Sequence, residues 1–376
     1  MSKSILLAGG GTAGHVNPLL AVADQIRATY PDAVIRVLGT KEGLESDLVP
    51  ARGFDLDLVP RVPMPRKPSP AWFTLPKKLN AAVRAARETM VTYETDVVIG
   101  FGGYVSTPAY LAARKLGVPV VIQEQNVRPG LANRLGTRWA SAISTTFAQT
   151  ALKGAQVTGL PLRHEIADLA DRLTTDRAAV RSTAAQELGL DPARPILVVT
   201  GGSLGALSLN TAVSQAAGQL LAQGMQILHL TGRGKSGPVL DAISGIDPIL
   251  RPDYHVLEYL AQMDLAYAVA DLVVCRSGAG TVCELAALGV PAIFVPLPIG
   301  NGEQRLNAMD MVNAGGALLV ADQDLTAQWL VDTVNPLLVD SQKLAAMSAS
   351  ARSVGQPDAA QKIVALVAQA AGWEKK

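Results

Sequence analysis

Short apolar runs alternate along the chain with longer stretches that have helical spacing. The apolar runs include SILLA, AVIRVLG, DVVIGF and VPVVIQ in the first half, and PILVVT, MQILHL, DLVVC and PAIFVPL in the second. Between them, Ala- and Leu-rich stretches place apolar residues three and four positions apart, as in an amphipathic helix. Strands that alternate with helices in this way predict βαβ units and parallel sheets.

This pattern occurs twice. SILLAGGGTAGHVNPLLAVADQI is echoed by PILVVTGGSLGALSLNTAVSQAA, and VVIGFGGYVSTPAYLAARKLGVPVVI by LVVCRSGAGTVCELAALGVPAIFVPL. Each echo follows about one domain's length downstream. We therefore predict an α/β protein with two Rossmann-like, doubly wound parallel-sheet domains that face each other across a cleft. Gly159 and Pro161 interrupt the pattern, so the boundary is expected near residues 157–166.

Composition narrows the class of protein. With 17% charged residues and a net charge of +1, the chain does not suit a protein that binds nucleic acid over its whole surface. Cys275 and Cys283 are the two cysteines, and small buried residues are a simpler interpretation than a metal or redox pair. The first apolar run is too short for a signal peptide, and no run is long enough for a transmembrane helix. We expect a cytosolic protein.

The turn GGGTAGH at residues 9–15 has the GxGxxG spacing of a dinucleotide-binding loop. A nicotinamide-binding fold would place an acidic residue at the end of its second strand. Here that strand ends in Gly39 and Thr40, and Glu42 already lies beyond it. A nicotinamide enzyme is therefore disfavoured, and glycines that merely let strand and helix pack closely remain an alternative.

One titratable residue stands at the start of the first predicted helix. His15 follows the glycine-rich turn, and an imidazole there titrates near neutrality, which suits a general base. A histidine that is exposed or satisfied by its neighbours is the alternative interpretation.

The second half offers a clearer binding site. GGSLGA (201–206) and RSGAGTVCE (276–284) place small residues and backbone N–H groups at two helix starts, an arrangement that binds anions. Ser203 and Thr281 add hydroxyl donors. Glu284 could accept hydrogen bonds from two sugar hydroxyls, or it could only favour the helix dipole.

Seven segments taken together carry a family resemblance. GGGTAGHVNP, GFGGYVS, QEQN, GLPLR, GGSLGA, CRSGAGTVCELAALGVPAIFVPLP and EQRLNA occur in this order between residues 9 and 308, and they resemble the MurG family. The resemblance implies a GT-B fold and an inverting, metal-independent transfer without a cofactor. N-acetylglucosamine (GlcNAc) would move from UDP-GlcNAc to the C4 hydroxyl of N-acetylmuramic acid (MurNAc) in undecaprenyl-pyrophosphoryl-MurNAc-pentapeptide, lipid I. The products would be UDP and lipid II, a precursor of peptidoglycan.

The resemblance also assigns the two domains. Residues 1–163 would bind the acceptor, with the C-terminal helix within 353–376 packed back on them, and residues 164–352 would bind the donor. The turn at 9–15 would hold the acceptor diphosphate together with Gly102, Gly103 and Tyr104. His15 would be the base, with Glu124 as the second candidate.

Donor-contacting positions follow from the same match. Glu284 would bind the ribose diol, Leu260 would meet uracil through its backbone, and Gln304 and Asn307 would face the GlcNAc hydroxyls, although helix capping would also explain these amides. Ala13 stands where many relatives have glycine, and Leu204 replaces a polar residue. The positions matched to donor contacts are Thr12, Ala13, Gly14, Asn126, Arg163, Ser203, Leu260, Ala279, Gly280, Thr281, Val282, Cys283, Glu284, Gln304 and Asn307.

Two further stretches contain residues that could bind a ligand. Asp55 and Asp57 form the Asp-x-Asp pair of metal-dependent transferases, but strand alternation explains them, and no metal is expected.

Residues 61–87 carry basic side chains, Arg66, Lys67, Lys77 and Lys78 among them, together with Trp72, Phe73 and Leu75, and no acidic one. Such a stretch suits the anionic inner leaflet of a membrane, at whose cytoplasmic face a peripheral protein would act. A Pro-rich loop before a solvated helix is the alternative.

Other classes of protein share part of this pattern. A UDP-GlcNAc 2-epimerase would have the same two-domain design and the same sugar nucleotide, but should carry more acidic catalytic residues. A sugar-nucleotide sensor would bind UDP-GlcNAc without releasing UDP.

Overall fold

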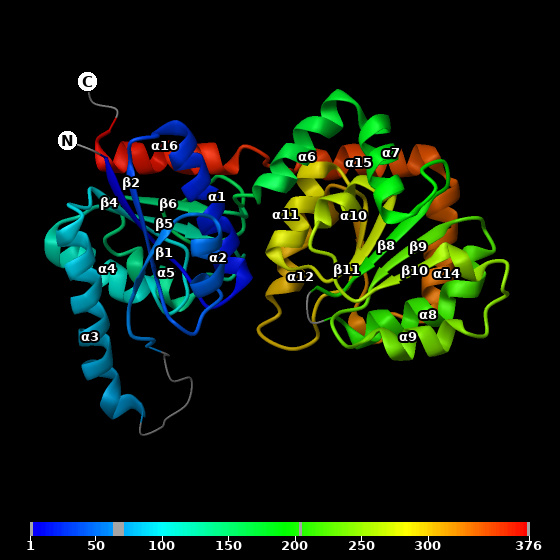
Figure 1. Ribbon diagram of the computed structural model, residues 1–376, viewed down its shortest axis with the longest axis horizontal. Coiled ribbons are helices and arrows are strands. Elements are labelled where there is room, and N and C mark those ends of the chain that lie inside the picture. Colours follow the sequence, from blue (N-terminus) through cyan, green and yellow to red (C-terminus); the bar gives the residue numbers. More distant parts are fainter. Residues whose placement is uncertain (1–2, 63–70, 203–204, 374–376) are drawn as a thin grey trace. The chain divides into compact units, whose positions relative to one another are not determined.

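The computed structural model describes residues 3–62, 71–202 and 205–373, and for residues 71–73 the backbone alone (Figure 1). The chain forms two compact units, Met1–Arg163 with Pro357–Lys376, and His164–Gln356. The sequence placed the end of the second domain at residue 352. The compact unit extends to Gln356: helix α15 (Ser341–Ser353) packs on α11 (Ala279–Leu288), and Gly355 beyond it lies against the backbone of Ala286 and Ala287.

The first unit is built on a parallel sheet with the strand order β3-β2-β1-β4-β5-β6-β7. The chain order reverses between β1 and β4, which is the position where open α/β sheets bind ligands. The strands are β1 (Ser4–Ala8), β2 (Val34–Gly39), β3 (Asp55–Leu58), β4 (Val97–Gly100), β5 (Val120–Glu124), β6 (Ala142–Thr145) and β7 (Gln156–Val157).

Helices cover both faces of this sheet. Ile5 and Leu7 of β1 pack in one hydrophobic cluster with α1 and α16, whereas Leu6 packs in another with α3 and α4. Alternate residues of a strand point to opposite faces, so β1 is buried on both sides. The helices are α1 (Ala13–Thr29), α2 (Glu45–Ala51), α3 (Ala71–Thr92), α4 (Ser106–Leu116), α5 (Leu131–Gly136) and α16 (Ala359–Ala371).

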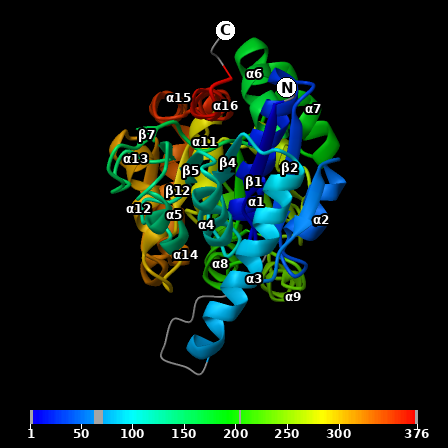
Figure 2. The same ribbon diagram turned by 90° about the vertical axis from the view of Figure 1, so that its left-hand side faces the viewer.

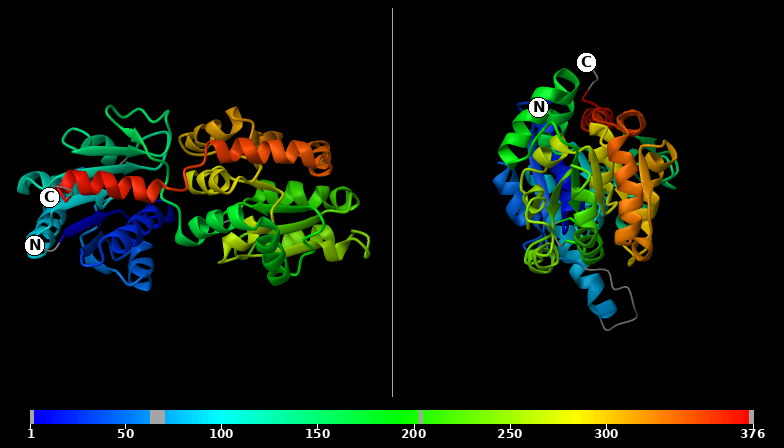
Figure 3. Two further views of the ribbon diagram at one scale, coloured as in Figure 1. Left: turned by 90° about the horizontal axis from the view of Figure 1, so that it is seen from above. Right: turned by 90° about the vertical axis from the view of Figure 1, so that its right-hand side faces the viewer.

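The C-terminal helix α16 belongs to this first unit. Ile363 and Val367 join the cluster of β1 and α1, and Figure 3 shows α16 (red) lying along the unit. Beyond the helix, Trp373 Nε1 donates to Asp96 Oδ2 at 3.1 Å. Helix α3 differs, because its N-terminal half projects away from the sheet (Figure 2).

The second unit repeats the design with the strand order β10-β9-β8-β11-β12-β13. Its strands are β8 (Ile196–Thr200), β9 (Gln226–Leu230), β10 (Tyr254–Leu257), β11 (Leu272–Cys275), β12 (Ala292–Phe294) and β13 (Ala317–Leu319). Besides α11 and α15, its α-helices are α6 (His164–Thr175), α7 (Arg177–Leu188), α8 (Leu207–Leu221), α9 (Ser236–Ile243), α10 (Met263–Val269), α12 (Glu303–Asn307), α13 (Met309–Asn313) and α14 (Ala327–Val339). All pairings in both sheets are parallel, so the prediction of two parallel α/β domains is confirmed.

A membrane-spanning helix must be both long and apolar. Within the described parts of the chain, no helix combines the length and the apolar character that crossing a bilayer requires.

Candidate functional site

Two glycine-rich turns meet at the carboxyl ends of β1 and β4. Gly103 has a φ of 80°, and a Cβ there would lie 2.6 Å from the carbonyl oxygen of Gly10. A Cβ on Gly102 would lie 3.3 Å from Nε2 of His15. Only glycine permits both the backbone angle and the close approach. The structure thus brings the turn at 9–12, His15 and the turn at 102–104 together.

His15 is half-buried in the first turn of α1. Its Nδ1 lies 3.0 Å from the hydroxyl oxygen of Thr12, and the direction of this hydrogen bond depends on the ring tautomer. For Nε2 to accept a proton, Nδ1 must carry the hydrogen and donate it to Thr12. The neighbouring hydroxyl can accept this hydrogen, so the geometry allows the tautomer that a general base at this position needs.

Glu124, the second candidate base, ends strand β5 with its side chain 2% exposed. Its Oε1 accepts from Asn126 N at 3.0 Å, and its Oε2 accepts from Gly130 N at 3.0 Å and Asn133 Nδ2 at 2.9 Å. Burial raises the pKa of the carboxyl, and these hydrogen bonds oppose that rise. The carboxylate holds the loop that carries Asn126, which favours a positioning role over proton transfer.

The remaining first-unit positions differ in exposure. Thr12, Ala13 and Gly14 are exposed at the start of α1, while Asn126 and Arg163 are half-buried. Arg163 is the last residue before the chain enters the second unit.

The matching turns of the second unit follow β8 and β11. Gly205 has a φ of 64°, and a Cβ there would collide with the carbonyl of Thr231. The N–H of Gly202 donates to Thr200 Oγ1 at 3.2 Å. Ser203, predicted to bind the donor, lies outside the described residues, as does Leu204.

The helix α11 begins directly after the turn at 276–278. Its first N–H groups point out of the helix end, where they can donate to an anion. Gly280 is exposed at this end, Thr281 and Cys283 are half-buried, and Glu284 is 9% exposed in the second turn. Ala279 and Val282 are buried against the unit, so any ligand contact of theirs would involve the backbone.

Three further donor positions lie elsewhere in the second unit. Gln304 accepts through Oε1 from Leu297 N at 2.9 Å, and Asn307 is fully buried at the end of α12. The Gln304 amide thus helps to hold the chain between β12 and α12. Leu260 is half-buried after β10.

Two residues without a predicted role organise these turns. Arg276 donates to the carbonyl oxygens of Val295 and Pro296 at 3.0 and 3.2 Å and forms an ion pair with Asp322. The arginine thereby joins the ends of β11 and β12. The second residue is Glu45, whose carboxylate lies beneath the turn at 9–12. A charged residue beside a glycine-rich segment was the only sequence signal for either of them.

The Asp-x-Asp pair has a structural partner. Arg36 donates to Asp55 at 2.6 Å and to both carboxylate oxygens of Asp57 at 2.9 Å. The hydrogen bond to Asp57 raises the pKa of Arg36. Both carboxylates therefore brace the edge of the sheet. In the described ranges no three His, Cys, Asp or Glu side chains gather as a metal-binding group.

Comparison with known proteins agrees with the two-unit fold. Residues 5–145 match the glycosyltransferase family 28 N-terminal domain, and residues 196–363 match the glycosyltransferase family 28 C-terminal domain. A curated relative from Bifidobacterium longum is 53% identical over an alignment 383 positions long. The alignment covers 98% of this chain and 97% of the relative. It is named UDP-N-acetylglucosamine–N-acetylmuramyl-(pentapeptide) pyrophosphoryl-undecaprenol N-acetylglucosamine transferase. The chain belongs to this transferase family.

Solved structures lead to the same conclusion. MurG from Acinetobacter baumannii is 28% identical with a TM-score of 0.76, and the match covers 98% of this chain and 99% of that one. A UDP-GlcNAc 2-epimerase from Neisseria meningitidis has a TM-score of 0.70 at 16% identity, with 98% and 100% covered, which shows a shared fold alone. The prediction of a GT-B fold in a MurG family member is confirmed.

Proposed function

We propose that the chain transfers GlcNAc from UDP-GlcNAc to the C4 hydroxyl of MurNAc in lipid I, giving lipid II and UDP. The observation that carries this proposal is the 53% identity to a transferase of this name over 98% of the chain. The pairing of glycine-rich turns with helix starts in both units supports it, because each unit then offers a place for a diphosphate.

The donor is proposed to bind the second unit. The N-terminus of α11 would receive the diphosphate of UDP-GlcNAc, since helix N–H groups and the helix dipole favour negative charge there. Glu284 would accept hydrogen bonds from the ribose hydroxyls. Arg276 would hold this end of β11 in place through its bonds to Val295 and Pro296.

The acceptor is proposed to bind the first unit, at the turns 9–12 and 102–104. The C4 oxygen of MurNAc would attack the anomeric carbon of GlcNAc while the bond from that carbon to UDP breaks. The hydroxyl proton would pass to Nε2 of His15, and the negative charge of the departing UDP would be balanced by helix N-termini and Arg163.

We further propose that residues 61–87 contact an anionic membrane at its cytoplasmic face. Lys77 and Lys78 are exposed on the projecting half of α3. Arg66 and Lys67 lie outside the described residues, and the side chains of Trp72 and Phe73 are not described. Exposed lysines attract anionic head groups. A projecting helix can reach these head groups while the rest of the unit stays away from the membrane.

An assay of UDP release tests the proposed reaction. Purified protein is incubated with UDP-GlcNAc, with and without lipid I. We expect UDP to appear only when lipid I is present. Binding of UDP-GlcNAc without UDP release in either condition would indicate a sensor, and formation of an epimerised sugar nucleotide without lipid I would indicate an epimerase. Either result would contradict the proposal.

A further inference from the structure

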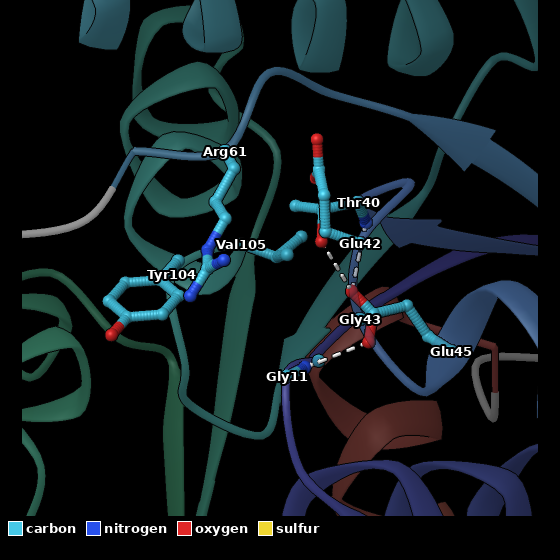
Figure 4. Close-up of a pocket in the computed structure, with 9 residues that line it drawn as sticks. Gly11, Thr40, Glu42, Gly43, Glu45, Arg61, Tyr104 and Val105 are labelled. Carbon is cyan, nitrogen blue, oxygen red and sulfur yellow. Dashed lines mark hydrogen bonds between the residues drawn. The ribbon is translucent and has the colours of Figure 1, made fainter.

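A buried carboxylate lies under the first glycine-rich turn. Glu45 is the first residue of α2, and its side chain is fully buried. Its Oε2 accepts from Gly11 N at 2.8 Å, and its Oε1 accepts from both the N–H and the hydroxyl of Thr40 at 2.9 Å. Figure 4 shows the carboxylate between the two loops. It therefore connects the turn after β1 to the loop after β2.

Three glycines leave the room that this side chain occupies. A Cβ on Gly10, Gly39 or Gly43 would collide with Glu45. These glycines come from both loops, so the two loops are shaped around one side chain. A buried carboxylate is costly unless its oxygens are hydrogen-bonded, and here three donors meet it. The arrangement specifies one conformation for the turn.

The turn that Glu45 supports leads directly to His15. Gly11, whose N–H is bound to Glu45, precedes Thr12, whose hydroxyl lies against the His15 ring. On its other side, the carbonyl of Gly10 packs against Gly103. A shift of the turn would thus move both Thr12 and the contact with the second turn.

A small pocket adjoins the same carboxylate. Gly11, Tyr104 and Arg61 contribute to its lining, and the Arg61 guanidinium lies 5.1 Å from the Tyr104 ring centre. Gly11 and Tyr104 belong to the two turns assigned to the acceptor. A change at Glu45 would consequently alter the shape of the proposed acceptor site.

We propose that Glu45 is a positioning residue for the acceptor half of the reaction. It acts through the turn at 9–12, which it holds in the conformation that presents Thr12 and His15. This inference rests on the proposed function.

The variant Glu45→Gln tests this role at nearly constant volume. Whichever way the amide turns, its NH₂ group faces a backbone N–H, of Gly11 or of Thr40, so at least one hydrogen bond is lost. We expect kcat/KM for lipid I to fall about tenfold or more, while KM for UDP-GlcNAc stays within about twofold of the wild type. Thr40→Val, which removes one of the three donors, should give a smaller fall.

Asp47→Asn is the matched control, because Asp47 is an exposed acidic residue of the same helix. It should leave both kinetic constants unchanged. Wild-type kinetics of Glu45→Gln would overturn the inference, and so would a rise in KM for UDP-GlcNAc as large as the fall in kcat/KM for lipid I, which would indicate a general folding role. Failure of the wild-type protein to release UDP with lipid I would instead contradict the proposed function itself.

Discussion

The glycine-rich turns after β1 and β8 are supported by different chemistry. A charged side chain, Glu45, lies under the turn after β1 and binds the N–H of Gly11 at 2.8 Å. The turn after β8 is supported by neutral groups. Gly205 packs on the Thr231 carbonyl, which accepts from Asn210 Nδ2 at 3.0 Å, and Asn210 Oδ1 lies 3.1 Å from His229 Nε2.

The difference bears on which turn suits a nucleotide diphosphate. A carboxylate beneath a turn opposes a second negative charge close by, because charges interact strongly where water is excluded. In the second unit, the Asp322 carboxylate accepts from Ser208 at the start of α8 but forms an ion pair with Arg276, so it adds no uncompensated charge. This comparison favours the turns of the second unit for the nucleotide diphosphate. In the first unit it directs the acceptor diphosphate to the start of α1 and the turn at 102–104, and it leaves the turn at 9–12 to present Thr12 and His15.

The largest effect is expected at His15. His15→Ala should lower kcat about 100- to 10,000-fold, because the acceptor hydroxyl loses its proton acceptor. Binding of UDP-GlcNAc, measured by calorimetry, should change little. Thr12→Val sharpens the test, since it removes the hydroxyl that would accept the hydrogen of Nδ1 in the base's tautomer, and it should give an intermediate rate. A near-normal rate for His15→Ala would remove this residue from the role of base.

A pH-dependent loss of stability is expected in the second unit. Burial lowers the pKa of His229 to about 4, from an ordinary value of 6.5. The unfolded chain therefore binds the proton more readily, and stability that is present above pH 6.5 is lost as the pH falls toward 4. The loss should reach about 3 kcal/mol.

Urea unfolding between pH 7 and pH 4, followed by hydrogen exchange in β8 and β9, measures this loss. His229→Asn should be less stable at neutral pH and should show a flatter dependence on pH. The same slope in the variant and the wild type would assign the loss to other groups.

A smaller effect is expected for the donor carboxylate. Glu284→Gln should raise KM for UDP-GlcNAc about 10- to 100-fold, since it weakens charge-assisted hydrogen bonds to the ribose. KM for lipid I should stay close to the wild-type value. Glu187→Gln, at an exposed position of the same unit, serves as the control. A change in KM for lipid I alone would reverse the assignment of the two units.

The smallest effect concerns the membrane. Reversing the charge of Lys77 and Lys78 should weaken binding to vesicles with anionic lipids about tenfold or more, because each lysine contributes about 1 kcal/mol. Lys343→Glu, an exposed change in the second unit, should have no comparable effect in a sedimentation assay. Equal binding of all three proteins would refute the membrane contact.

Hydrophobic patterning was sufficient to predict the central strands. In β1, Ile5 and Leu6 face opposite clusters and both are fully buried, so the strand is apolar along its length, as expected for a buried parallel strand. The short strand β7, Gln156–Val157, lacks such a run. Its backbone pairing with β6 defines it, and pairing leaves little trace in a single sequence.

The candidate base was proposed from residue type and position alone, and it stays a prediction. A histidine after a glycine-rich turn suggested a base, and the structure places it beside Gly102. Glu45 was missed because its role depends on three glycines that converge on it from two loops. Such a contact exists only in the folded chain. The sequence could show that Glu42 lies beyond the second strand, but not that Glu45 turns inward beneath the first turn.

A crystal structure with UDP-GlcNAc tests the central claim most directly, namely that the second unit holds the nucleotide sugar. We predict the diphosphate at the N-terminus of α11 and the ribose against Glu284. A uridine diphosphate bound at residues 9–15, with nothing near Glu284, would contradict the account.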